Sequence, residues 1–130
     1  MLTTNLTTMK IEQNILLELS DSSSDAFQVC LENGQLVHLN SEASQRLGIP
    51  RDKVSDYYVP DFEKIFGERN SIQWQAHVQE LKQKKTLEIE GSNLNISTGE
   101  RFPVEVKVKY DKINGVGYII ASSRDVSDRV

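Results

Sequence analysis

The chain has 130 residues, of which 38% are hydrophobic and 26% charged, and its formal net charge is −4. This length fits one ordinary domain with its own core, and this composition is neither that of a disordered chain nor that of a membrane-spanning one. The acidic balance argues against a nucleic-acid surface. One cysteine allows no internal disulfide and no Cys-rich zinc site, and it fits a reducing compartment. We therefore expect a cytoplasmic domain without membrane insertion, nucleic acid or metal.

The segment from Met9 to Leu19 has the periodicity of an amphipathic helix. Its apolar stripe consists of Ile11, Ile15, Leu16 and Leu19. An apolar stripe of this size needs to be covered, either by the domain's own sheet or by a second copy of the chain. We favour the second copy, so these residues are the predicted interface of a homodimer.

Alternating apolar residues predict two strands, over 26–31 and 35–39. The dipeptide Asn33-Gly34 lies between them and suits a type I′ turn, in which both central residues have positive φ. The two strands are therefore expected to form a β-hairpin.

Two helices are predicted next, separated by an irregular stretch over 51–70. The first begins at Asn40 or Ser41, whose side chains suit a helix N-cap, and stops at Gly48. The second begins at Ser71 and ends among lysines, whose charge suits the C-terminal end of the helix dipole. Its apolar stripe contains Trp74, His77, Val78 and Leu81.

Three strands should follow, the clearest of them over 102–110. Its apolar face carries Phe102, Val104, Val106, Val108 and Tyr110. Asn114-Gly115 predicts a hairpin turn into the last strand, over 116–124. Strands grouped at the two ends of the chain, with helices between them, predict an α+β fold built on one antiparallel sheet.

Several short motifs, taken in this order, resemble those of PAS domains. They are Glu32-Asn33-Gly34 with Val37 and Asn40, Ala43, Leu47-Gly48, the helix from Trp74 to Leu81, Thr98-Gly99-Glu100 leading into Phe102-Pro103-Val104-Glu105-Val106, and Arg124-Asp125-Val126-Ser127-Asp128-Arg129. The resemblance is nearest to the PAS modules of bacterial sensor histidine kinases and cyclic-dinucleotide signalling proteins. The chain departs from the usual pattern at Lys84-Lys85, where a glycine often stands.

The resemblance implies a PAS-like, five-stranded antiparallel sheet with helices on one face, enclosing a site for a small ligand. It divides the chain into a tail with the amphipathic helix, over 1–19, and a PAS sensor domain, over 20–130. Residues 125–130 then begin a signalling linker to an effector domain that lies beyond this chain.

The same resemblance places a cofactor- or ligand-binding pocket at Trp74, His77, Leu81 and Tyr118. Haem-binding members of the family supply an axial histidine from the helix that carries His77, but the residues around His77 do not match theirs. A histidine on an apolar stripe is more often structural, and Trp74 at helical spacing is more often a core residue than a flavin contact. Haem and flavin are therefore not favoured, and we expect a colourless metabolite or no ligand.

Two further positions have a structural and a functional interpretation. Cys30 lies in a predicted strand, outside the Asn-Cys-Arg motif of light-sensing relatives, so we expect an inert buried thiol. In the family, an aspartate at the position of Asp125, here preceded by Arg124, ties the sheet to the linker and biases the signal. The structural alternative is that Asp125 or Ser127 caps the next helical turn.

Three functions fit these observations. The first is a sensory input domain of a bacterial signal-transduction protein. The second is a ligand-free dimerisation or docking module, whose cavity would be filled by side chains such as Phe27, Trp74, Phe102 and Tyr118. The third is a small enzyme with His77 as general base, which requires a carboxylate nearby. The chain has no phosphate loop, nucleophile elbow or His-x-x-x-His pair, so we expect no catalysis.

One group of carboxylates stands out in the irregular stretch. Asp56, Asp61 and Glu63 lie close in sequence to Tyr57 and Tyr58. Charged residues in a loop usually form a solvated surface, and we expect that here.

Overall fold

The computed structural model describes residues 24–129. The amphipathic segment with Ile11, Ile15, Leu16 and Leu19 lies outside the described residues. Among the helices of the described part, none is both long and apolar enough to span a bilayer.

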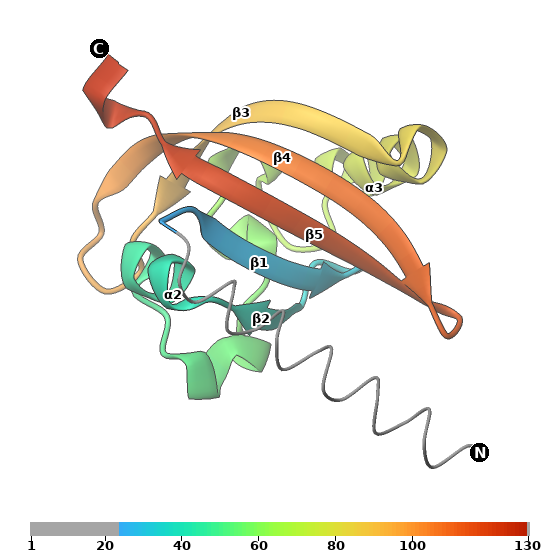
Figure 1. The fold of residues 1–130 in the computed structure, drawn as a ribbon, viewed down its shortest axis with the longest axis horizontal. Helices are drawn as coiled ribbons and strands as arrows, with labels where there is room; N and C mark the ends of the chain where they lie inside the picture. Colours follow the sequence, from blue (N-terminus) through green and yellow to red (C-terminus); the bar gives the residue numbers. More distant parts are fainter. Residues whose placement is uncertain (1–23, 130) are drawn as a thin grey trace.

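Five strands form one antiparallel sheet in the order β2-β1-β5-β4-β3 (Figure 1). Their bounds are Ala26–Leu31 for β1, Leu36–Leu39 for β2, Thr86–Leu94 for β3, Arg101–Ile113 for β4 and Val116–Asp125 for β5. The first strand pairs with the last, so that Ala26 lies opposite Ser123. The chain therefore enters and leaves the sheet at the same end. The predicted α+β class and the five-stranded sheet are confirmed.

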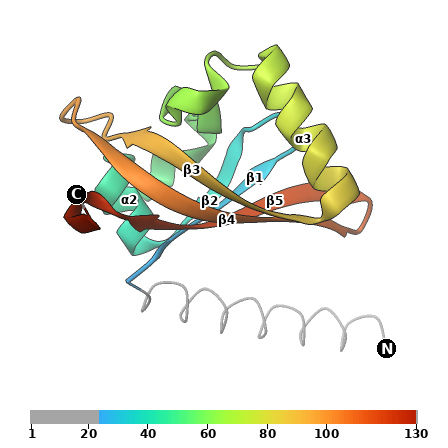
Figure 2. The ribbon, with the colours of Figure 1, turned by 90° about the horizontal axis from the view of Figure 1, so that it is seen from above.

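The helices pack on one face of this sheet (Figure 2). They are α2 (Ser41–Leu47), α3 (Ile72–Lys84) and, between these two, the 3-10 helices η1 (Arg51–Asp56), η2 (Val59–Asp61) and η3 (Lys64–Phe66). A last 3-10 turn, η4 (Ser127–Arg129), follows β5. The predicted stretch of irregular structure thus consists mainly of short helical turns laid over the core.

The core lies between the helices and the inner face of the sheet. In β4 the predicted alternation holds, because Val104, Val106, Val108 and Tyr110 are all buried. From α3, the buried side chains are Trp74, Val78 and Leu81. The apolar face of β4, with its period of two residues, and the apolar face of α3, with its period of 3.6 residues, therefore belong to the same core.

The predicted type I′ turn at Asn33-Gly34 is wrong, although the hairpin itself is confirmed. Only Gly34 has positive φ, at 91°, and its amide donates to the carbonyl of Leu31 at 2.9 Å. This is a type I turn closed by a glycine in the left-handed region. Tertiary contact explains the choice: a Cβ on Gly34 would lie 3.3 Å from the ring of Trp74, and the indole N–H of Trp74 donates to the Glu32 carbonyl at 2.9 Å.

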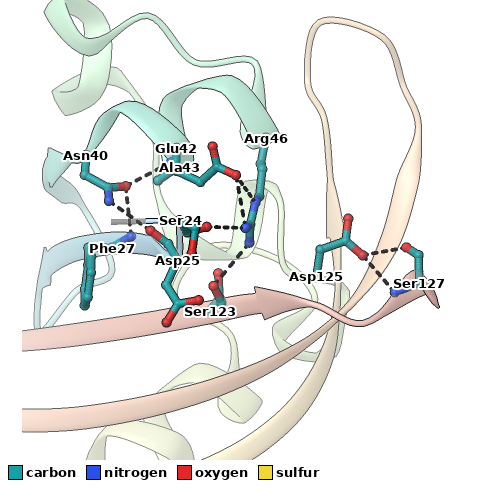
Figure 3. A network of polar contacts seen from close by, with 10 residues as sticks. All are labelled: Ser24, Asp25, Phe27, Asn40, Glu42, Ala43, Arg46, Ser123, Asp125 and Ser127. Atoms are coloured by element: carbon teal, nitrogen blue, oxygen red, sulfur yellow. Dashed lines mark hydrogen bonds and ion pairs between the residues drawn. The ribbon is translucent and has the colours of Figure 1, made fainter. Parts of the chain in front are cut away.

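Asn40 joins α2 to the edge of β1. It is 0% exposed; its side-chain oxygen accepts from the amides of Phe27 and Ala43, both at 2.9 Å, and its side-chain nitrogen donates to the Asp25 carbonyl at 3.0 Å (Figure 3). The N-cap of α2 is thus Asn40, one of the two predicted candidates, and the same side chain also accepts a hydrogen bond from the amide of Phe27 in β1. Buried backbone groups that lose such a partner have no water to replace it.

Replacing Asn40 with alanine should lower the free energy of unfolding by about 2–4 kcal/mol, because two buried amides lose their acceptor and the helix loses its cap. Urea denaturation followed by circular dichroism measures this loss. Gln45→Ala, at an exposed position of the same helix, is the control and should change stability by less than about 0.5 kcal/mol. A loss as small for Asn40→Ala as for the control would contradict the bridging role.

Candidate ligand-binding cavity

A small cavity lies between the inner face of the sheet and the segment from η2 to α3. Its volume is about 30 Å³. That is room for one or two water molecules and far less than the several hundred Å³ of a drug-sized or cofactor site. Its lining is Gln28, Cys30, Val59, Phe62, Glu63, Phe66, Trp74, His77, Ile89, Asn93, Val106, Val108, Ile119, Ala121 and Ser123.

Three rings form one wall of the cavity. Phe66 meets Trp74 edge to face, with centroids 5.0 Å apart, and His77 lies 4.6 Å from Phe66 and 5.5 Å from Trp74. Trp74 is 2% exposed and fixed by its hydrogen bond to the Glu32 carbonyl. The wall is therefore closely packed and rich in π-electron density.

His77 belongs to this wall as an uncharged ring. Burial lowers its pKa below the ordinary value, against a small opposing effect of the Glu80 charge. The imidazole is therefore neutral at physiological pH.

Glu63 is the carboxylate that sequence reasoning placed wrongly. It was expected on a solvated surface, but it is 3% exposed and lines the cavity. Its Oε2 accepts from the amide of Ser92 at 3.1 Å and from that of Ile65 at 3.3 Å, whereas Oε1 is buried and accepts no hydrogen bond. Its pKa is raised, because burial outweighs the lowering effects of these two amides, of the Arg101 charge and of the Lys64 amide.

Gly91 on β3 makes room for this carboxylate. A Cβ at residue 91 would fall within bonding distance of Glu63 Oε1. The carboxylate therefore lies against the strand, in the space that a side chain at residue 91 would occupy. A glycine inside a strand often marks such a close approach, and this was the one sequence signal that could have located Glu63.

The remaining polar lining comes from strands. Cys30 is 1% exposed, and burial raises the pKa of its thiol to about 12, so it stays protonated and unreactive, as expected. Asn93 on β3 and Ser123 on β5 are buried and line the same cavity. Polar groups thus face the cavity from several strands, opposite the aromatic wall.

The predicted pocket residues separate into three groups. Trp74 and His77 line the cavity. Leu81 is 0% exposed and belongs to the core beside it, without lining it. Tyr118 alternates with the lining residues Ile119 and Ala121 of β5, so its side chain lies on the opposite face of the sheet.

The end of β5 has the capping geometry that was the structural alternative for Asp125. One carboxylate oxygen of Asp125 accepts from both the amide and the hydroxyl of Ser127 (Figure 3), and the Ser127 hydroxyl is the main reason that the pKa of Asp125 is lowered. Arg124 beside it is exposed. The Asp125 side chain therefore holds the first residue of η4, and its signalling role stays a prediction.

Arg46 on α2 links the two ends of the described chain, and nothing in the sequence pattern singled it out. Its guanidinium donates to the Ser24 carbonyl at 2.7 Å, to the Ser123 carbonyl at 3.2 Å and to the Glu42 carboxylate at 3.1 Å (Figure 3). The side chain of Ser123 lines the cavity while its carbonyl holds Arg46. A single residue, Ser123, thus belongs both to the cavity and to the Arg46 contact that links the two ends.

No protein-family model matches this chain, and no curated protein sequence matches it. Solved structures do match it. A PAS domain of an HTR-like protein from Haloarcula marismortui has a TM-score of 0.78 at 19% identity, covering 95% of this chain and 99% of that one. A PAS domain from a two-component sensor histidine kinase has a TM-score of 0.76 at 16% identity, covering 90% and 98%.

A third similar structure is a domain of a sensory box sensor histidine kinase/response regulator from Geobacter sulfurreducens, with a TM-score of 0.71 at 15% identity, covering 90% of this chain and 96% of that one. Similarity at these identities is similarity of fold. Together with the strand order and the helices on one sheet face, it shows that this chain has the PAS fold.

Proposed function

We propose that this chain is the cytoplasmic sensory input domain of a signal-transduction protein, in which a small ligand in the cavity alters the end of β5. The observation that carries the proposal is the position of Ser123. Its side chain lines the cavity, its carbonyl accepts from Arg46, and Asp125 follows two residues later. A ligand that shifts β5 would therefore act on the contacts at both chain ends.

The predicted division of the chain belongs to this proposal. Residues 1–19 would mediate homodimerisation, residues 20–130 would form the sensor, and residues 125–130 would begin a linker to a covalently attached effector domain. The hydrogen bonds from Ser127 to Asp125 would set the starting direction of that linker, because only Val126 separates β5 from η4. Arg124 and Asp125 are the proposed output residues.

A ligand-free dimerisation or docking module is the second candidate, favoured by the small volume of the cavity. Of the four side chains expected to fill the space, only Trp74 lines it, and two other buried aromatic residues, Phe62 and Phe66, line it as well. A core so nearly full would hold a ligand of only a few atoms unless the wall moves.

A catalytic role is not part of the proposal. Glu63 is the carboxylate that such a role required in the same cavity as His77. Its hydrogen bonds, however, go to the amides of Ser92 and Ile65 rather than to the imidazole. General-base catalysis relies on a base oriented by its partner, and these contacts orient the carboxylate on the backbone instead.

Filling the cavity should abolish ligand binding. We expect a thermal-shift screen of small colourless metabolites to yield compounds that stabilise the protein. Ala121→Val should remove that stabilisation, because the larger side chain fills part of the cavity that residue 121 lines. Ser122→Val is the matched control, because residue 122 lies on the opposite face of β5. Compounds that stabilise the Ala121→Val variant as well as the native chain bind elsewhere and would contradict a sensory cavity.

Removing Arg46 should loosen both ends of the domain together. In Arg46→Ala, amide hydrogen exchange over 24–27 and 123–127 should quicken by about tenfold, the effect of losing hydrogen bonds to a charged group. Exchange in α3 should not change. Lys53→Ala, an exposed residue of η1, is the control and should leave both segments protected. If only one segment responds to Arg46→Ala, Arg46 does not couple the two ends.

A charge on the N-terminal stripe should dissociate the dimer. We expect Ile15→Glu to give a monomer by light scattering, because a carboxylate would be buried without a partner in the apolar interface. Gln13→Glu adds the same charge on the polar side of the segment and should leave the dimer intact. An Ile15→Glu protein that keeps its dimeric mass would rule out this interface.

A further inference from the structure

We propose that the cavity binds a small ammonium-type cation, such as ammonium or methylammonium, through Glu63 Oε1. This inference rests on the proposed sensory function and names the chemistry of its ligand. It is carried by three features of the cavity: an unpartnered carboxylate oxygen, an aromatic wall and a volume of about 30 Å³.

The carboxylate is held in place with one oxygen left over. Oε2 of Glu63 is fixed by the amides of Ser92 and Ile65, and Gly91 provides the space that the carboxylate occupies. Oε1 is buried and has no hydrogen-bond donor. A buried acceptor in this state is costly, and a ligand that donates a hydrogen bond to it recovers that cost.

The charge of Glu63 also lacks a partner in the described part of the chain. None of the lysine or arginine side chains described there forms an ion pair with it, and the Arg101 charge lowers the pKa of Glu63 by less than burial raises it. A carboxylate buried in apolar surroundings is stabilised by an opposite charge at close range. The ligand that completes the cavity is therefore a cation.

The aromatic wall of the cavity suits an ammonium group. Phe66 and Trp74 present rings to the cavity, and the ring of His77 is uncharged. Aromatic faces attract ammonium groups, and they do so more strongly where water is excluded. Metal cations instead require several oxygen ligands, and within residues 24–129 no group of three or more His, Cys, Asp or Glu side chains is placed to hold one.

The size of the cavity limits the ligand. About 30 Å³ accommodates ammonium or methylammonium but not a nucleotide, a haem or a flavin. Oε1 itself lies against Gly91 and is closed to a sphere the size of water. A cation in the cavity therefore reaches it when the Glu63 carboxylate turns from Gly91 toward the cavity.

Acid should weaken this binding, because a proton competes with the cation for Glu63. The titratable groups that face the carboxylate across the cavity are His77 and Cys30, and the Arg101 charge acts on it from β4. Protonation of His77 would also oppose a cation, whereas the Cys30 thiol stays neutral throughout. Affinity should therefore be highest at neutral pH and fall as the pH is lowered.

The chain's single tryptophan, Trp74, reports on the cavity directly. We expect its fluorescence to change saturably with ammonium chloride and with methylammonium chloride at constant ionic strength. Potassium chloride is the matched probe, because potassium carries the same charge but donates no hydrogen bond. Glu63→Gln should weaken binding of both ammonium salts by about tenfold or more, the scale of a charge-assisted hydrogen bond.

Two variants keep the test decisive. Asp61→Asn removes a nearby charge that pairs with Arg69 outside the cavity, and it should bind ammonium like the native chain. If Glu63→Gln is misfolded by circular dichroism, Ala121→Val takes its place, because that substitution narrows the cavity and should also abolish binding. A potassium response equal to that of ammonium, a non-saturating response, or equal binding by native and cavity variants would overturn the proposal.

The outcomes also separate this inference from the proposed function. If ammonium fails but a metabolite stabilises the native chain and not Ala121→Val, the sensory cavity stands and its assigned ligand class is wrong. If ammonium binds through Glu63 without changing hydrogen exchange over 123–127, the ligand class is right and the sensory role fails.

Discussion

The pairing of the first strand with the last determines most of what this domain can do. Because β1 lies beside β5, residues that enter the domain and residues that leave it occupy one end of the sheet. Arg46 connects the two segments, because its guanidinium donates one hydrogen bond to the Ser24 carbonyl and another to the Ser123 carbonyl. A fold that joined its strands in chain order would separate the two ends and leave no position for such a bridge.

Trp74 organises the other side of the core. Its indole holds the β1–β2 turn, its ring covers Gly34, and its neighbours on α3 complete the aromatic wall. The turn and the cavity therefore share one buried, hydrogen-bonded side chain. Protein interiors pack too closely to deform gradually, so under the proposed function a change in the cavity would be transmitted as a shift of whole elements rather than as local softening.

The fold was largely predictable from the sequence, because its signals are local. Alternation in β4, capping at Asn40 and the stop at Gly48 depend on neighbours a few residues apart. The site was not predictable to the same degree. Glu63 is indistinguishable from a surface acid within its irregular segment, and its burial arises from a strand about thirty residues away. Tyr118 was misplaced because alternation shows which residues share a face but not which face is inner.

Glu63 and Gly91 occupy a single space between them, since the carboxylate of one lies where the side chain of the other would be. The residue types that fit at these two positions therefore depend on each other. A chain that retains the acid is confined to glycine at the strand position, whereas a chain that first loses the acid gains room for an ordinary strand residue there. A residue larger than glycine at position 91 would in turn exclude a glutamate at position 63 from its buried place.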